Sequence, residues 1–358
     1  MPRPLPIGHA PPASNKELQE KMNKFKVLVT SKHPGNAARS LAERFEVDLN
    51  SDNAVLGPGE LAARLRGCDA VLTLLEDRMT AGLMASLPHL KVVANCAVGY
   101  DNVDVQAATR LGILVTNTPG VLDETTADLA FALLLACARR VVEADRFVRE
   151  GRWRSFTPDL LLGVDVHGKT LGIVGMGRIG KAMARRAHGF GMSILYTRRS
   201  AAPADGAPPG ARAVSLEKLL AVSDFVSVHC PLDSQTRHLI GRRGFSIIKE
   251  GSILVNTARG AVVDQAALIE ALDRGRLRGA GLDVFEAEPA VPPQLIASGR
   301  VVLTPHIGSA SIETRSAMAQ LAADSILSAL SGRMPANAVN PEVWETMAAR
   351  LRSGAAQA

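Results

Sequence analysis

The sequence is poor in aromatic residues and cysteines, and it contains no long hydrophobic run. Aromatic residues make up 4% of the chain, which is too few for an extended surface on which nucleic-acid bases could stack. The net charge of +6 is spread over 358 residues, whereas a nucleic-acid-binding surface needs a basic cluster or stripe. The densest apolar run, residues 129–138, is far shorter than the roughly 20 residues of a membrane-spanning helix. We therefore predict no nucleic-acid partner and no membrane span.

Disulfide and metal-binding patterns are missing as well. The four cysteines lie far apart without CxxC or CxxH spacing, and the histidines show no metal-ligand spacing. We therefore predict neither a disulfide scaffold nor a metal site. The N-terminus has no basic start followed by an apolar core, so no secretory signal is expected. These features favour a reduced, cytoplasmic protein.

The apolar content is sufficient for two or three domains. Hydrophobic residues make up 47% of the chain and charged residues 21%, which is typical of folded chains. Residues 1–24 are rich in proline, alanine and polar side chains, and they are predicted to form a disordered extension. Because Met22 stands just before the first strand candidate, we interpret residues 1–21 as an extension ahead of the natural start.

Short β-branched runs alternate with helix-like segments from Phe25 onward. The strand candidates are 25–30, 70–75, 91–96 and 113–117, then, after a helical stretch at about 123–149, 170–175, 193–197, 225–230, 252–259, 279–285 and 301–305. Continuously apolar strands are typical of buried parallel sheets, and strands that alternate with helices predict βαβ units. The predicted fold class is α/β, with two doubly wound parallel-sheet domains of Rossmann or flavodoxin type. A last helix is expected at about 309–331.

A glycine motif follows the strand candidate at 170–175. Gly175, Gly177 and Gly180 form GxGxxG between a strand and a helix, a context in which the pattern predicts dinucleotide binding. Gly175 permits the tight turn, Gly177 lets the backbone approach the pyrophosphate, and Gly180 lets the helix pack on the strand. The amides of Arg178 and Ile179 are expected to face the anion at the helix N-terminus. The alternative is a glycine-rich turn without a ligand.

The strand that follows this helix indicates which dinucleotide is bound. It ends in Arg198, Arg199 and Ser200, and no acid lies between residues 191 and 204 where an NAD-type carboxylate is expected. Two guanidinium groups can bind a 2′-phosphate through charge-assisted hydrogen bonds. We therefore predict a preference for NADP(H), with NAD(H) possible; the alternative is a pair of solvated surface arginines. At another strand end, the backbone at Cys230 and the ring of Pro231 can line the cofactor cleft.

Three polar side chains stand at the ends of successive strand candidates. They are Arg259, Glu288 and His306, and ligands of open α/β sheets bind beyond the carboxyl ends of the strands. Reduction of a 2-oxoacid needs such a trio. The arginine can hold the substrate carboxylate, the histidine can protonate the carbonyl oxygen, and the glutamate can orient the imidazole. Taken singly, each of these residues is more often structural or solvated.

The motifs together resemble the D-isomer-specific 2-hydroxyacid dehydrogenase family. VGMGRIG, NTARG, GLDVFEAEP and LTPHIGSA carry the likeness, and the segment from Val92 to Arg139 resembles the glyoxylate/hydroxypyruvate reductase branch. The resemblance implies that Arg259, Glu288 and His306 are catalytic. It also implies cofactor contacts by Met176, Gly177, Arg178, Ile179, Arg198, Arg199, Ser200, Thr257, Ala258, Arg259 and Asp283, and substrate contacts by the amides of Val98 and Gly99.

The resemblance also implies a discontinuous domain organisation. A substrate domain of residues 25–122 and 307–345 is expected to contain an inserted NAD(P)-binding domain of residues 123–306. Residues 346–358 are expected to form a flexible tail. The helical region from Asp123 and the segment around Trp153 resemble the family's dimerisation region, which predicts a homodimer.

Several functions remain compatible with the sequence. The first is an NADPH-preferring reductase of glyoxylate and hydroxypyruvate. A second keeps the fold and trio but takes another substrate, such as D-lactate, 2-ketogluconate, phosphoglycerate or phosphite. The third is a dinucleotide-sensing binding protein similar to corepressors of this fold.

Overall fold

The computed structural model describes residues 25–199 and 205–353, which form two compact units. The inserted unit is Gly120–Thr314, and the split unit combines the chain up to Pro119 with the chain from Arg315 onward. These limits lie three residues before the expected boundary at 122/123 and eight residues after the expected boundary at 306/307. The predicted extension 1–24, Ser200 and the last residues of the predicted tail lie outside the described residues.

The split unit is built on a five-stranded parallel sheet. Its strands are β1 (Lys26–Val29), β2 (Glu46–Leu49), β3 (Ala70–Thr73), β4 (Val92–Asn95) and β5 (Leu114–Thr116), in the order β2-β1-β3-β4-β5. The helices are α2 (Ala37–Ala42), α3 (Pro58–Arg64), α4 (Ala81–Ala85), α5 (Val105–Arg110) and α14 (Trp344–Ser353), with η2 (Pro341–Val343), and α13 (Ile312–Leu330) begins in the inserted unit. This strand order is that of flavodoxin-like folds.

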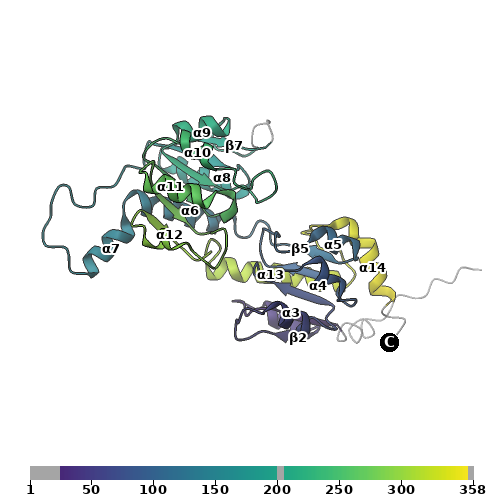
Figure 1. Cartoon of the computed structure of the whole chain (residues 1–358). Helices are drawn as coiled ribbons and strands as arrows, with labels where there is room; N and C mark the ends of the chain where they lie inside the picture. Colours follow the sequence, from purple (N-terminus) through teal and green to yellow (C-terminus); the bar gives the residue numbers. More distant parts are fainter. Residues whose placement is uncertain (1–24, 200–204, 354–358) are drawn as a thin grey trace, which may run out of the picture. The chain divides into compact units, whose positions relative to one another are not determined.

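The inserted unit is built on a seven-stranded parallel sheet (Figure 1). Its strands are β6 (Thr170–Val174), β7 (Ser193–Thr197), β8 (Arg212–Ala213), β9 (Phe225–Val228), β10 (Ser252–Asn256), β11 (Leu277–Leu282) and β12 (Val301–Leu303). The order β12-β11-β10-β9-β6-β7-β8 reverses direction between β6 and β9, which is the topological switch point of a Rossmann fold. The predicted fold class is confirmed.

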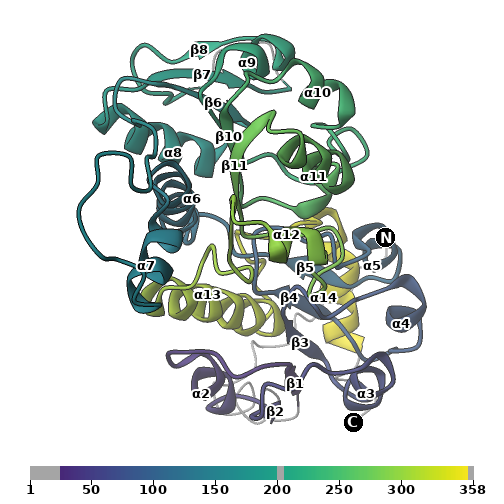
Figure 2. The same cartoon turned by 60° about the vertical axis from the view of Figure 1, so that its left-hand side comes forward.

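Helices cover both faces of the seven-stranded sheet. The helices of this unit are α6 (Asp123–Ala138), α7 (Val141–Arg149), α8 (Arg178–Gly189), α9 (Leu216–Val222), α10 (Arg242–Ile247), η1 (Gly260–Val262), α11 (Gln265–Asp273) and α12 (Pro293–Ala297), of which α7 has no buried residue. Alternate residues of one strand point to opposite faces. In β10, Ile253 and Val255 therefore join the core under α6 and α8, whereas Leu254 joins the core under α9, α10 and α11. Figure 2 shows α6 and α8 on one side of the sheet and α11 on the other.

Four details differ from the sequence-based expectations. Strand β8 was missed because it consists of two exposed residues at the edge of the sheet. Strand β2 was missed because it is an exposed edge strand in which Glu46 and Asp48 replace apolar residues. The helix expected over 123–149 is two helices, because Arg140 takes a left-handed backbone with φ of 54° between α6 and α7. The prediction of a flexible tail from 346 is wrong for 346–353, which belong to α14, where Met347 is fully buried. No helix among the described residues is long and apolar enough to cross a membrane.

Candidate active site

The glycine turn lies at the switch point of the inserted unit. Gly175 follows β6 with φ of +102°, and a Cβ on this residue would lie 2.6 Å from the backbone nitrogen of Cys230 after β9. Glycine is therefore required here by both the turn and the close approach. A Cβ on Gly180 would lie 2.1 Å from the carbonyl oxygen of Gly175, so α8 packs directly against the turn. Gly177 caps α8, whose first residues are Arg178 and Ile179, while Met176 is buried.

The turn fits a dinucleotide phosphate. A Cβ on Gly177 would meet nothing within 4 Å, so the backbone at the helix N-terminus is open to an anion. In the sheet, β10 is separated from β6 by β9 alone, and the loop after β10 carries Thr257, which is buried. Within the described part of the chain, its hydroxyl oxygen has no hydrogen-bond partner. Buried polar atoms are normally paired, so this hydroxyl is available to a ligand.

The end of β7 carries the two predicted phosphate-binding arginines. Arg198 and Arg199 are both exposed. Arg199 forms an ion pair with Asp233, which comes from the loop after β9. The hydrogen bond from Arg199 is the main reason why the pKa of Asp233 lies below its usual value. Sequence reasoning missed Asp233 because it is 34 residues from Arg199 along the chain.

The end of β9 lies against the glycine turn. Cys230 is partly buried and Pro231 is exposed, and the hydroxyl of Thr236 donates to the carbonyl of Pro231 at 2.6 Å. Burial raises the pKa of the Cys230 thiol to about 11, so this cysteine stays protonated near neutral pH. Removal of the neighbouring His229 ring from solvent lowers the pKa of that histidine to about 4.

The loop after β10 is held by the side chain of Asn256. Its Oδ1 accepts a hydrogen bond from the amide of Ala258 at 3.0 Å, and its Nδ2 donates to the carbonyl of Arg259 at 3.0 Å. A Cβ on Gly260 would lie 1.9 Å from the carbonyl carbon of Phe285, so the loops after β10 and β11 are in direct contact. This contact brings Arg259 toward the loop that carries Glu288.

Glu288 and His306 meet at the ends of β11 and β12. The Nδ1 atom of His306 donates to Oε2 of Glu288 at 2.7 Å, and the amide of Phe285 donates to Oε1 of Glu288 at 2.9 Å. Burial by itself would raise the pKa of Glu288. The hydrogen bonds from His306 and Phe285, together with the charge of Arg259, outweigh burial and leave the pKa below its usual value. Glu288 is therefore ionised at neutral pH and faces the imidazole as an anion.

Asp283 anchors the loop that carries His306. This residue is fully buried, and its carboxylate accepts hydrogen bonds from the hydroxyl of Thr304 at 2.6 Å and from the amides of Ile307 and Gly308, both at 2.8 Å. Burial raises the pKa of Asp283 against the effect of these donors. The predicted contact of Asp283 with a nicotinamide carboxamide stays a prediction, but this anchoring role was not foreseen from the sequence.

The predicted substrate-binding residues Val98 and Gly99 belong to the split unit. They lie in the loop after β4, and their carbonyl oxygens accept hydrogen bonds from Asn117 and Asn95, each at 2.8 Å. Neither asparagine was identified from the sequence, because a side chain that binds a distant backbone carbonyl leaves no periodic pattern.

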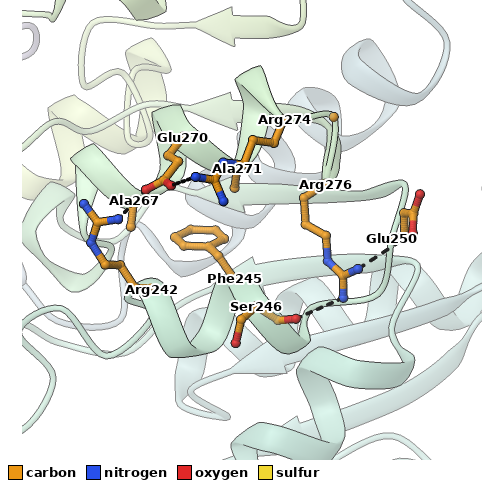
Figure 3. Close-up of a pocket in the computed structure, with 10 residues that line it drawn as sticks. Arg242, Phe245, Ser246, Glu250, Ala267, Glu270, Ala271, Arg274 and Arg276 are labelled. Carbon is orange, nitrogen blue, oxygen red and sulfur yellow. Dashed lines mark hydrogen bonds and ion pairs between the residues drawn. The ribbon is translucent and has the colours of Figure 1, made fainter.

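A separate pocket of about 450 Å³ lies between α10 and α11 (Figure 3). Its arginines already have acidic partners: Arg242 and Arg274 both pair with Glu270, and Arg276 pairs with Glu250. These ion pairs leave little uncompensated charge for an anionic ligand. Among the described residues, no group of three or more histidine, cysteine or acidic side chains could hold a metal ion.

Comparison with known proteins gives the class of protein. Residues 131–308 match the family model described as D-isomer specific 2-hydroxyacid dehydrogenase, NAD binding domain. The matched range contains the glycine turn, Arg259, Glu288 and His306. The protein is an oxidoreductase that uses a nicotinamide dinucleotide.

Whole-chain comparisons then give the family. A glyoxylate reductase from Korarchaeum cryptofilum is 52% identical over 323 residues, covering 89% of this chain and 97% of the relative. A crystal structure of a Thermus thermophilus protein superposes with a TM-score of 0.83 at 48% identity, covering 88% of this chain and all of the other. An NADPH-dependent glyoxylate/hydroxypyruvate reductase from Sinorhizobium meliloti, in complex with NADP and malonate, has a TM-score of 0.77 at 36% identity, with coverages of 88% and 97%. The chain belongs to the D-isomer-specific 2-hydroxyacid dehydrogenase family, in its glyoxylate reductase branch.

Proposed function

We propose that the protein reduces small 2-oxoacids, glyoxylate to glycolate and hydroxypyruvate to D-glycerate, and that it prefers NADPH. The observation that carries this proposal is the 2.7 Å hydrogen bond between His306 and Glu288, beside the charge of Arg259. Two of the proteins named above are a glyoxylate reductase and a glyoxylate/hydroxypyruvate reductase, which supports the same substrates here.

The proposed mechanism assigns proton transfer to His306. A bound reduced nicotinamide supplies the hydride that reaches the carbonyl carbon of the substrate. As this carbon is reduced, the carbonyl oxygen gains negative charge, and protonated His306 donates its Nε2 proton to that oxygen. The anionic Glu288 accepts the hydrogen bond from Nδ1, which fixes the orientation of the ring and leaves Nε2 to face the substrate. In the reverse direction, His306 takes the proton from the hydroxyl group.

The substrate carboxylate is assigned to Arg259 and to the amides of Val98 and Gly99. A guanidinium can bind a carboxylate through two parallel charge-assisted hydrogen bonds, which also orients the carbonyl carbon. Backbone amides add neutral donors that bind an anion without adding mobile side chains. Arg259→Ala is therefore expected to raise KM for the 2-oxoacid and to lower kcat.

Turnover assays test the proposed activity directly. Oxidation of NADPH with glyoxylate, hydroxypyruvate, pyruvate and 2-ketogluconate, followed at the nicotinamide absorbance, should give the highest kcat/KM for the first two. Higher kcat/KM for pyruvate or 2-ketogluconate would refute the substrate assignment. Tight NADPH binding without turnover of any of the four would indicate a dinucleotide-sensing protein instead.

The proposed NADPH preference depends on the arginines after β7. Each charge-assisted contact to a 2′-phosphate contributes roughly 1.5–3 kcal/mol, so Arg199→Ala should lower kcat/KM for NADPH about 10- to 100-fold. The value for NADH should change little. Arg39→Ala is the matched control, because Arg39 on α2 is an exposed arginine in an ion pair with Glu43. A wild-type preference for NADH would contradict the proposal.

We also propose a homodimer formed through the region around α7. No residue of α7 is buried, and the segment after it extends away from the sheet of the inserted unit (Figure 1). Large apolar side chains are exposed here, including Val148, Trp153 and Phe156, the last with 84% of its surface exposed. Contiguous exposed apolar side chains mark interaction surfaces. A solution mass of 37.8 kDa by light scattering, which is the mass of the monomer, would refute the dimer.

A cytoplasmic location completes the proposal. All four cysteines are free thiols, and burial raises the pKa of Cys96 and Cys137 to about 12. Buried protonated thiols that need no disulfide suit a reducing compartment. When the protein is isolated without a reductant and then denatured, titration with a thiol reagent should therefore find four thiols. A smaller number would contradict the proposal.

A further inference from the structure

The loop after β4 is fixed by three consecutive carbonyl oxygens. The carbonyl of Ala97 accepts a hydrogen bond from the amide of Thr118 at 2.9 Å. The carbonyl of Val98 accepts from Nδ2 of Asn117, and that of Gly99 accepts from Nδ2 of Asn95, both at 2.8 Å. Three successive peptide groups are thus held by donors from the same unit.

Fixing a carbonyl also fixes the direction of the next amide. In a trans peptide group the C=O and the following N–H point in opposite directions within one plane. The bond from Thr118 therefore orients the N–H of Val98, and the bond from Asn117 orients the N–H of Gly99. Neither of these two N–H groups donates a hydrogen bond to any residue that the structure describes. Both are therefore held facing away from the donors that bind the carbonyls.

The two asparagines are themselves held in place. The carbonyl of Asn117 accepts from Nδ2 of Asn337 at 2.5 Å, and Asn337 in turn bonds the hydroxyl of Ser325 on α13. Asn95 is fully buried at the end of β4, where its Oδ1 accepts from Thr73 at 3.2 Å and from Asn102 at 3.1 Å. The donors that orient the loop are therefore rigid before any ligand binds.

We propose that Asn117 is a positioning residue that aims the amide of Gly99 at the carboxylate of the substrate, and that Asn95 fixes the adjoining peptide. This inference rests on the proposed function, in which the amides of Val98 and Gly99 bind that carboxylate. A preorganised donor binds an anion without the cost of ordering itself, so loss of the orienting bond weakens carboxylate binding. Cofactor binding is not affected, because the glycine turn belongs to the other unit.

The test is Asn117→Leu, which keeps the approximate shape but removes the donor. KM for glyoxylate should rise about 10- to 100-fold, the size of effect that follows from small misplacement of binding groups. The Kd for NADPH, measured by nicotinamide fluorescence, should stay within about threefold of wild type. The kcat/KM for glycolaldehyde, an uncharged aldehyde of similar size, should also be unchanged. The preference of the enzyme for glyoxylate over glycolaldehyde should therefore fall by the same factor.

Asn340→Leu is the matched control for lost stability. Asn340 is a buried asparagine whose side chain binds the amide of Val115 and the carbonyl of Ile113 at the start of β5, whereas Asn117 follows the end of that strand. It should lower thermal stability without changing KM or substrate preference. If Asn117→Leu does not fold, Asn117→Ser provides the same measurement with a hydroxyl too short to reach Val98.

The outcomes separate the inference from the proposed function. If wild-type protein reduces glyoxylate and both Asn117 variants keep its KM and its preference over glycolaldehyde, the positioning role is wrong while the proposed function stands. If wild-type protein does not discriminate glyoxylate from glycolaldehyde, the proposed carboxylate site is wrong, and the positioning role is wrong with it.

Discussion

Among the described residues of the inserted unit, two histidine–glutamate pairs occur, and both use the segment after β11. Glu286 accepts a hydrogen bond from Nε2 of His238 at 2.8 Å, and Glu288 accepts one from Nδ1 of His306 at 2.7 Å. Both histidines have a left-handed backbone, with φ of 51° and 53°. The two pairs therefore agree in distance and in backbone φ, although they use different ring nitrogens.

The surroundings of the two pairs differ. Glu288 lies near the charge of Arg259, and the loop of His306 is anchored by buried Asp283 at the carboxyl end of the sheet. The backbone amide of His238 instead donates a hydrogen bond to the carbonyl oxygen of Ala261. A short histidine–carboxylate distance is therefore shared by the pair that we propose to be catalytic and by a pair to which we assign no role. The charge of Arg259 beside Glu288, at the carboxyl end of the sheet where ligands of such folds bind, is the reason for assigning the role to His306.

The largest expected effect comes from changing the two histidines in parallel. His306→Asn should lower kcat about 10²- to 10⁴-fold, because it removes the proton donor, while the Kd for NADPH stays unchanged. His238→Asn should change kcat by less than about threefold. Steady-state kinetics and fluorescence titration measure both. Equal losses in the two variants would mean that the pairs are not functionally distinct.

A smaller effect is expected from the two glutamates. Glu288→Gln removes the negative charge beside the imidazole but can still accept a hydrogen bond, so kcat should fall about 10- to 100-fold. Because the pKa of Glu288 lies below its usual value, wild-type protein keeps this carboxylate ionised as the pH falls through the ordinary glutamate range. Glu286→Gln is the control and should retain nearly all of kcat. A Glu288→Gln enzyme with wild-type kcat would remove the carboxylate from the mechanism.

The smallest expected effect concerns His229, a half-buried histidine whose Nε2 lies 2.8 Å from the hydroxyl of Ser227. Its pKa is lowered to about 4, so the unfolded chain takes up a proton near pH 6.5 while the folded chain does not. The contribution of His229 to the free energy of unfolding is therefore fully present above pH 6.5 and is lost as the pH falls toward 4. When the pH is lowered from 7 to 5, the protonation of this histidine in the unfolded chain should lower the free energy of unfolding by about 2 kcal/mol. Urea unfolding of His229→Gln should show a correspondingly smaller loss, and an equal loss would contradict the prediction.

The fold could be predicted where burial leaves a pattern in the sequence. Strand β10 reads as SILVN, five buried residues between a turn and a polar loop, and its position was predicted closely. Strand β2 reads as EVDL and has no such pattern, because only one side of an edge strand is paired. The break at Arg140 was not visible either, since no glycine or proline marks it.

The candidate site could be predicted only in its chemically distinctive residues. Glycines before a helix and polar residues after buried strands identified the glycine turn, Arg259, Glu288 and His306. The residues that hold the loops of the candidate site are ordinary: Asp283, Asn256 and Asn117 act through hydrogen bonds to the backbone. Which backbone atom each one reaches depends on the folded chain, so spacing in the sequence contains no sign of it.

The division of the split unit between two stretches of chain has a consequence for biosynthesis. All five of its strands leave the ribosome before the inserted unit does, but Asn337, Asn340 and most of α13 emerge only after it. The side chain of Asn340 binds Val115, 225 residues earlier, and Asn337 binds Asn117 across a similar separation. Closing contacts over such long separations is slow relative to folding of a contiguous domain. A nascent chain can therefore complete its nucleotide-binding half while the loop at Val98 and Gly99 still lacks its last support.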